Sequence, residues 1–212
     1  MGLLMLDFKG ILLALILGLL IYNIIGLNGL ILLFIFLIIS VIVSKTGYYE
    51  KKEMGVNEKE RGWLNVYSNG IMPLAFAVLS SKFGIVPFIS SVASAMADKF
   101  GSELGIFDDN VFSIIGWKRI KPGLSGGVSP LGTFASLVGS LIISLSAYAL
   151  FNLSYIDVIV ISISGFFGSL IDSLAGYYEE KGIGNKAMSN IMGTLFGGVL
   201  SIILMKMIGV IM

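Results

Sequence analysis

The chain contains no cysteine and no histidine, and only 13% of its 212 residues are charged. The missing side chains exclude disulfides, thiolate nucleophiles, histidine bases and zinc sites built from cysteine or histidine. A bound metal must therefore have oxygen ligands, and Mg²⁺ is the metal that we expect. The net charge of +1 argues against a nucleic acid as a partner.

Hydrophobic residues make up 56% of the chain, which is too many for a soluble domain with a polar surface. The first apolar run is followed directly by a second, which indicates a retained helix rather than a cleaved signal peptide. A membrane helix needs roughly 20 apolar residues. We predict an all-α membrane protein, a polytopic bundle of about seven transmembrane helices at residues 9–25, 28–44, 63–81, 84–100, 129–150, 155–174 and 190–211.

The basic residues are distributed unevenly between the two sides of this predicted bundle. If the N-terminus is cytoplasmic, 12 of the 14 Lys and Arg residues lie on the cytoplasmic side, and only Lys82 and Lys206 lie on the other. Cytoplasmic loops of membrane proteins carry the excess of positive charge. We therefore predict an integral cell-membrane protein with a cytoplasmic N-terminus.

Composition divides the chain into three parts. Residues 1–44 form two helices of nearly pure Ile, Leu and Phe, which we expect to be peripheral and lipid-facing. Residues 45–62 form a charged cytoplasmic loop. Residues 63–212 hold five helices with many Gly, Ser and Ala residues, which allow close packing in a membrane. We expect these five helices to form the core, with an active site that faces the cytosol.

Three carboxylates, Asp98, Glu103 and Asp172, lie at the cytoplasmic ends of predicted spans. Acids in such positions are costly and usually functional, and together they could hold Mg²⁺ and its phosphate ligands. We expect Gly101 to end its helix, so that Glu103 folds back toward Asp98. The alternative is an interfacial ion pair between Asp98 and either Lys99 or Lys121. Asp108, farther along the loop, is expected to be solvated.

The segment KPGLSGGVSPLGT at 121–133 indicates a phosphate-binding loop. Its glycines free the backbone to direct N–H groups at an anion, and Lys121 adds positive charge. Ser129 and Pro130 suit the N-cap and first position of a helix whose dipole favours anions. The loop lacks the ending of a Walker A motif, and a tight turn with an ordinary cap is an equally good interpretation.

Other polar side chains fall near the same face. Arg61 can bind a phosphate, and Asn65 and Asn69 lie one helical turn apart. Asn185 and Asn190 flank the start of the last predicted span. These amides either orient a ligand or hydrogen-bond neighbouring helices.

Four segments together resemble a family of small integral-membrane proteins that includes the plant phytyl-phosphate kinase. They are RGWLNVYSNG (61–70), ASAMADKFGSELG (93–105), GGVSPLGT (126–133) and GSLIDSLAG (168–176). The resemblance covers roughly residues 55–200. It implies a kinase that uses CTP to phosphorylate an isoprenyl monophosphate, of the phytyl or geranylgeranyl phosphate type, to the diphosphate.

The resemblance also implies roles for individual residues. Asp98, Glu103 and Asp172 would be catalytic and bind Mg²⁺. Nucleotide and phosphate would contact Lys121, Ser125, Gly126, Gly127, Ser129, Thr133, Arg61, Asn65, Asn69 and Asn190. The alternatives are a cytidylyltransferase acting on a lipid phosphate, a small membrane transporter and a non-catalytic scaffold. A transporter would be expected to carry polar groups at mid-membrane, which the predicted spans lack.

Overall fold

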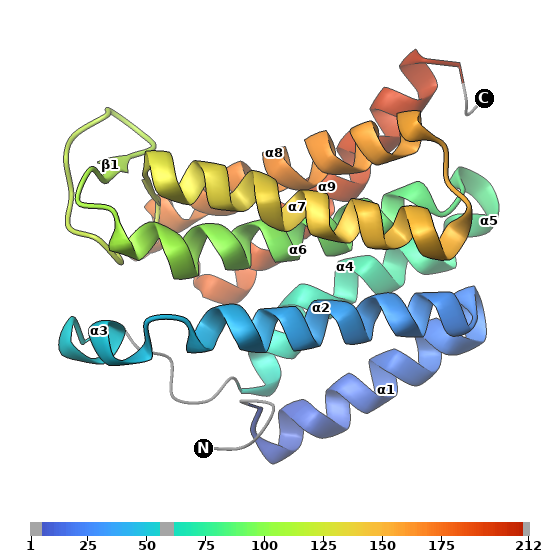
Figure 1. Cartoon of the computed structure of the whole chain (residues 1–212), viewed down its shortest axis with the longest axis horizontal. Helices are drawn as coiled ribbons and strands as arrows, with labels where there is room; N and C mark the ends of the chain where they lie inside the picture. Colours follow the sequence, from blue (N-terminus) through green and yellow to red (C-terminus); the bar gives the residue numbers. More distant parts are fainter. Residues whose placement is uncertain (1–5, 56–61, 210–212) are drawn as a thin grey trace.

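The computed structural model describes residues 6–55 and 62–209, and seven long helices in this part of the chain follow the predicted spans (Figure 1). They are α1 (Phe8–Ile25), α2 (Leu27–Lys45), α4 (Trp63–Val78), α6 (Val86–Leu104), α7 (Pro130–Phe151), α8 (Tyr155–Glu179) and α9 (Lys186–Met207). The short elements are α3 (Tyr48–Glu53), α5 (Ser80–Phe83), a 3₁₀ turn at Gly105–Phe107, and the strands β1 (Phe112–Ser113) and β2 (Gly127–Val128).

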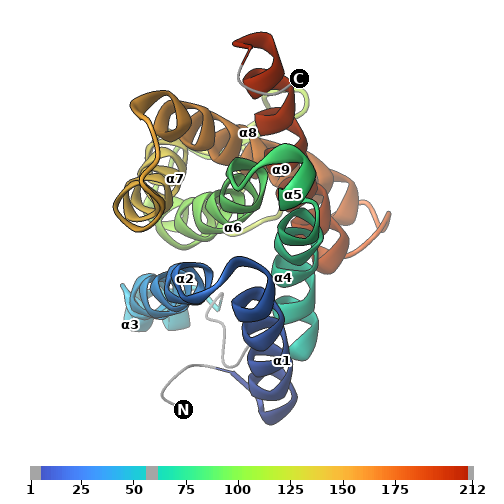
Figure 2. The ribbon, with the colours of Figure 1, turned by 90° about the vertical axis from the view of Figure 1, so that its right-hand side faces the viewer.

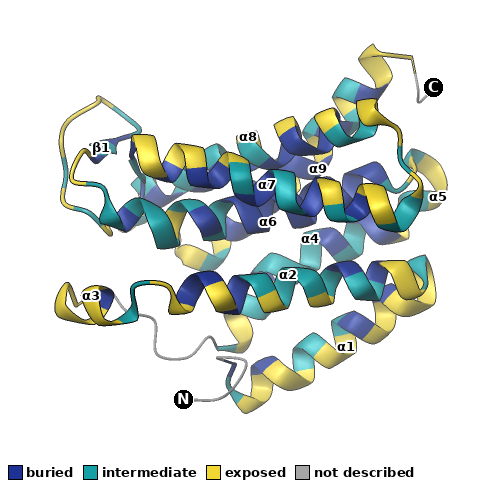
Figure 3. Ribbon diagram, viewed as in Figure 1, coloured by how far each residue is buried: buried dark blue, intermediate teal, exposed yellow. Residues whose placement is uncertain are grey.

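Five of the long helices, α1, α2, α7, α8 and α9, are long and apolar enough to cross a membrane. Helix α4 is shorter, at 16 residues, and α6 carries charged residues in its last two turns. Helix α6 is nevertheless the most buried helix of the described chain, with 13 of its 19 residues buried (Figure 3). Because α6 faces protein on most sides, it needs less apolar surface than a lipid-exposed helix.

The other helices surround α6 unequally. Helices α7, α8 and α9 pack against it closely, whereas the α1–α2 hairpin stands to one side and α4 lies between α1 and α9 (Figure 2). Helix α1 buries only Gly10, Gly18 and Ile21 and exposes most of its apolar side chains. This exposure suits contact with lipid.

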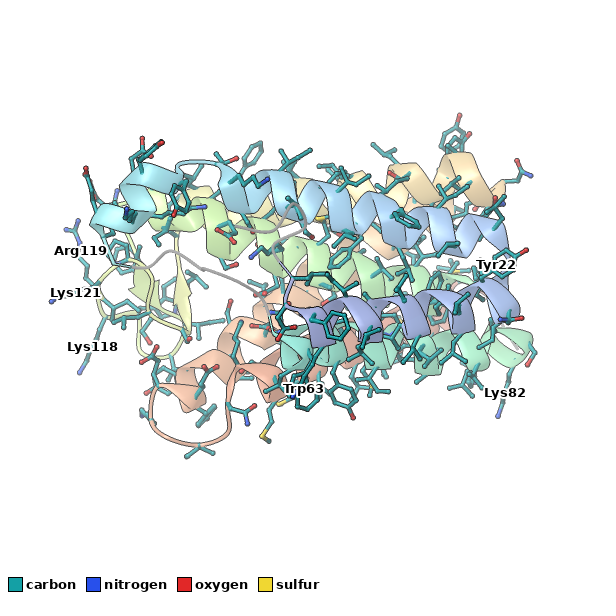
Figure 4. The ribbon with its side chains drawn as sticks, turned by 90° about the horizontal axis from the view of Figure 1, so that it is seen from below. Tyr22, Trp63, Lys82, Lys118, Arg119 and Lys121 are labelled. Carbon is teal, nitrogen blue, oxygen red and sulfur yellow. The ribbon has the colours of Figure 1, made fainter. Side chains whose placement is uncertain are left out.

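Polar connections gather at one end of the bundle, which we call the polar end. It holds α3, residues 105–129 and the α8–α9 loop (Figure 1). Lys118, Arg119 and Lys121 project from it, and Lys82 lies at the opposite end (Figure 4). The bundle thus separates basic residues as the sequence predicts. That the polar end faces the cytoplasm stays a prediction.

Close helix packing fixes the inner wall of the polar end. A Cβ added to Gly193 of α9 would lie 2.9 Å from the carbonyl oxygen of Gly168 on α8 and 3.0 Å from Cβ of Asp172. Ser94 of α6 donates a hydrogen bond of 2.9 Å to the Gly193 carbonyl. Helices α6, α8 and α9 therefore meet next to Asp172, because small residues let their backbones approach.

Several helix ends differ from the prediction, and two of them bear on predicted site residues. Helix α6 continues through Gly101 to Leu104, so the expectation that Gly101 ends the helix is wrong. Glycine is needed there because α7 crosses closely, and an added Cβ would collide with Oγ of Ser136. Helix α9 begins at Lys186 rather than at residue 190, so Asn190 lies inside the helix.

Residues 105–129 form a folded loop. Strands β1 and β2 pair antiparallel, with Phe112 opposite Val128 and Ser113 opposite Gly127. The Arg119 guanidinium donates to the Asp109 carbonyl at 3.0 Å. The all-α prediction did not include this strand pair, which is too short to leave a periodic pattern in the sequence.

Candidate functional site

A cavity of about 310 Å³ opens at the polar end, between the ends of α6, α7, α8 and α9 and the loop 123–129. Its ionisable lining comprises three lysines and four acids: Lys51, Lys99, Lys186, Asp98, Glu103, Asp172 and Glu179. We call it the polar cavity. Because acids outnumber lysines in the lining, a polyanion would need an accompanying cation to bind there.

Two of the predicted acids meet on a single ammonium group. Nζ of Lys186 lies 2.7 Å from Asp172 and 3.8 Å from Asp98. The Asp172 side chain is only 4% exposed, whereas that of Lys186 is 48% exposed. Asp98 on α6 and Asp172 on α8 therefore form one site, with Lys186 from α9 between them.

Lys186 was not among the candidate residues from the sequence. Asn185 caps α9, its Oδ1 accepting a hydrogen bond of 3.0 Å from the Met188 amide, so Lys186 occupies the first helical position. A cation there opposes the helix dipole. This unfavourable placement is the sequence signal that could have identified it.

Glu103 lies apart from the other two acids. Five residues along a helix turn its side chain roughly 140° away from Asp98. It forms ion pairs with Lys51, at 2.7 Å, and with Lys99, and it accepts a hydrogen bond of 2.7 Å from Ser44. Glu103 thus lines the polar cavity as the partner of two lysines.

The oxygen donors of the polar cavity decide which metal it could hold. Across residues 6–55 and 62–209, no three acidic side chains form a group that could hold a metal ion. Mg²⁺ often needs only one or two carboxylates, with phosphates and waters completing its shell. Asp98 and Asp172 fit that requirement. The predicted contribution of Glu103 to metal binding stays a prediction.

The glycine loop lies where the sequence places it. Ser125, Gly126, Gly127, Ser129 and Thr133 all line the polar cavity. Part of the backbone is already engaged, since the Ser125 amide donates to Glu180 at 2.9 Å. Gly126 has a φ of +78°, and a Cβ added there would lie 2.6 Å from Cα of Tyr177. The loop therefore docks against α8.

The start of α7 carries the predicted cap and a further acid. Ser129 Oγ accepts a hydrogen bond of 3.0 Å from the Gly132 amide, which confirms the N-cap. Asp108 accepts one of 2.9 Å from the Leu131 amide. Hydrogen bonds from the Leu131 and Asn110 amides hold the pKa of Asp108 below its usual range. A phosphate bound at the start of α7 would compete with Asp108 for the backbone N–H donors of this helix end.

The predicted phosphate ligand Lys121 does not line the polar cavity. Lys121 is exposed near the tip of the folded loop and points away from the bundle (Figure 4). Arg61 falls outside the described residues. The ion pair that the structure shows at Asp98 is with Lys186, rather than with either lysine of the alternative interpretation.

An apolar groove of about 450 Å³ adjoins the polar cavity, between the α1–α2 hairpin, α4 and α6. Asn65, Asn69 and Asn190 line it rather than the polar cavity. Four residues line both spaces: Asp98, Lys99, Ser102 and Lys186. The two spaces therefore share a boundary, which carries Lys186 and the carboxylate of Asp98.

Residues 3–202 match the family described as integral membrane protein DUF92. The chain belongs to this family. A DUF92 relative is an uncharacterized membrane protein of Methanocaldococcus jannaschii, 34% identical over 94% of this chain and 85% of the relative. Another, from Synechocystis, is 25% identical over 77% of this chain and 67% of the relative.

A plant protein is also related to this DUF92 chain. Protein PGR of Arabidopsis thaliana is 27% identical over 68% of this chain and 62% of its own length. No solved structure matches the chain. Membership of an integral-membrane family with a plant relative confirms the resemblance seen in the sequence.

Proposed function

We propose that this DUF92 protein is a CTP-dependent kinase that converts an isoprenyl monophosphate into the diphosphate at the cytosolic membrane face. The observation that supports it most is the shared boundary of the polar cavity and the apolar groove, where Lys186 meets Asp98 and Asp172. An amphiphile lying across this boundary would place its phosphate beside these residues and its tail in the groove.

The charges of the cavity support Mg²⁺ assistance. Four acids outnumber three lysines, so two phosphorylated substrates would add negative charge to a site that is already slightly acidic. Mg²⁺ held by Asp98 and Asp172 would neutralise phosphate oxygens, which is what phosphoryl transfer chiefly requires. The Lys186 ammonium would then contact a phosphate oxygen.

The transfer itself needs positioning rather than a strong base. A non-bridging oxygen of the lipid phosphate attacks the γ-phosphorus of CTP and forms the new P–O bond. The bond from that phosphorus to the β,γ-bridging oxygen breaks, and CDP leaves with the electron pair. Both reacting phosphates are ionised, so no proton must be removed, which suits a chain without histidine or cysteine.

The remaining predicted residues take positioning roles in this proposal. Ser125, Gly126, Gly127, Ser129 and Thr133 would hold the nucleotide phosphates from the loop side. Asn65, Asn69 and Asn190 would orient the acceptor where the groove begins. Glu103 would keep Lys51 and Lys99 in place, Lys121 would meet the nucleotide outside the cavity, and Arg61 would bind a phosphate.

The activity is tested with purified protein in lipid nanodiscs, geranylgeranyl phosphate, Mg²⁺ and CTP labelled on either the γ- or the α-phosphate. We expect only the γ-label to enter the lipid product, and chelation of Mg²⁺ to abolish the transfer. An α-label in the lipid would instead indicate cytidylyl transfer. Flux of the lipid phosphate across liposomes without labelled product would indicate a transporter.

The site is tested by replacing its two carboxylates. Asp98→Asn and Asp172→Asn should each lower the transfer rate by about 10²–10³-fold, because they remove charge that stabilises the transition state. Asp109→Asn, an identical change in the exposed loop, is the matched control. Unchanged transfer in both site variants, with normal thermal unfolding, would contradict the assignment.

A further inference from the structure

The apolar groove extends well beyond its polar boundary. On α4 its lining runs from Asn65 to Pro73, a distance of about 12 Å along the helix axis. On α6 it runs from Ser102 to Val92. Beyond the asparagines its walls are apolar, with leucine and phenylalanine side chains from α1 and α2.

The groove also reaches the lipid-facing surface. Leu15 and Leu19 of α1 and Phe34 of α2 line it, and they are 59%, 62% and 54% exposed. Because these exposed side chains belong to its lining, the groove is open to the lipid-facing surface along the hairpin. A hydrocarbon chain could therefore pass sideways from the bilayer into the groove without crossing the polar cavity.

We propose that this groove holds the single hydrocarbon tail of a lipid phosphate and that the α1–α2 hairpin sets the accepted tail length. The occupant follows from the lining, because the groove's polar boundary carries the ammonium groups of Lys186 and Lys99 beside the Asp98 carboxylate, and the walls beyond the asparagines are apolar. Asn190 adds a buried Oδ1 that has no hydrogen-bond partner within the described chain. The identity of the tail as isoprenoid rests on the proposed function.

Gly70 is the position that controls the width of the groove. A Cβ added there would lie 2.5 Å from Cδ1 of Leu17, so a larger side chain would fill the space between α4 and α1. The neighbour is the end of a flexible side chain, and Gly70 lies within α4. Gly70→Leu should narrow the groove, and adding Leu17→Ala should reopen it.

The proposal is tested by photo-crosslinking in nanodiscs, with dodecyl phosphate that carries a diazirine at the end of its tail. We expect the label on peptides of α1, α2 and α4 that line the groove. Excess geranylgeranyl phosphate should remove the label, and geranylgeraniol, which lacks the phosphate, should not. Label on the outer faces of α7 and α8, unaffected by the competitor, would overturn the proposal.

Variants make the length dependence measurable. Gly70→Leu should lower labelling by the dodecyl probe about tenfold, leave a hexyl probe unaffected, and be rescued by Leu17→Ala. Gly70→Ala is the milder variant if the leucine prevents folding. Ala149→Leu, which adds one carbon less to an exposed position of α7, is the control. Equal labelling of all variants by both probes would contradict the proposal.

Crosslinking does not require phosphate transfer. Groove labelling in a protein that transfers no phosphate would leave this inference standing and overturn the kinase. Phosphate transfer without groove labelling would support the kinase and overturn the proposed tail-binding groove.

Discussion

Lys186 is the residue that joins the two acids of the candidate site, because its ammonium contacts both Asp98 and Asp172. The sequence identified both acids from their cost in a membrane helix, but it gave no distance between them. Their meeting depends on the close approach of α8 and α9 at Gly168 and Gly193. The lysine between them was overlooked because a polar loop with several charges usually indicates solvent exposure.

Lys186→Met should lower kcat/KM for the lipid phosphate by about 10²-fold, since the proposed contact between the ammonium group and the phosphate is lost. The change also leaves Asp172 buried without its cation, so the Tm should fall. Lys186→Arg should restore part of the activity, because the charge is retained in a different geometry. Lys181→Met, an exposed change in the same loop, is the control for steady-state assays and thermal unfolding. Unchanged kcat/KM in Lys186→Met would contradict a role in phosphate binding.

Glu103→Gln tests the acid that lies apart. Glu103 partners Lys51 and Lys99, so the substitution should lower the free energy of unfolding by about 3 kcal/mol, as expected when a buried ion pair is broken. The Mg²⁺ concentration for half-maximal activity should stay unchanged, whereas Asp172→Asn should raise it. A Mg²⁺ titration of both variants measures this, and an equal rise in Glu103→Gln would make Glu103 a metal ligand.

At the scale of elements, the long apolar runs predicted the positions of the seven helices, most ends lying within a few residues of those observed. Hydrophobicity over about 20 residues is a strong and local signal. The ends near the site were less predictable. Glycine is common at helix ends, but Gly101 lies inside α6, where it allows α7 to cross at close range. The sequence of α6 does not show this role, because it depends on the position of α7.

The glycine loop offers a test of element packing. Gly126 and Gly116 have nearly equal φ angles, +78° and +81°, so alanine strains the backbone similarly at both. Only Gly126 also meets the backbone of α8, at Tyr177, whereas nothing lies within 4 Å of a Cβ on Gly116.

Gly126→Ala should therefore detach the loop from α8 while the helices are retained. Activity should fall at least tenfold, because the loop would no longer position its phosphate-binding groups. Gly116→Ala should leave activity near that of the wild type. Circular dichroism and transfer assays check both. Equal loss in the two variants would show that backbone strain alone, rather than docking on α8, explains the effect.

At the scale of the whole molecule, orientation in the membrane can be tested cleanly because the chain has no cysteine. Lys118 and Lys82 lie at opposite ends of the bundle (Figure 4). In intact cells, a membrane-impermeant maleimide should label Lys82→Cys and not Lys118→Cys, and permeabilised cells should show both. The cysteine-free parent is the control, and the reverse pattern would place the polar end outside the cell.

The sequence by itself determined the class of protein, the seven long helices and their order, the uneven charge, and eight of the residues that line the polar cavity. These features depend on composition and on signals within single segments, such as the Ser129 cap. Tertiary structure alone decided that Asp98 and Asp172 share Lys186, that Glu103 is paired elsewhere, and that an apolar groove joins the polar cavity. The reason is physical: each feature depends on distances between helices far apart in the chain. Those distances are set by small residues packing against backbone rather than by local propensity.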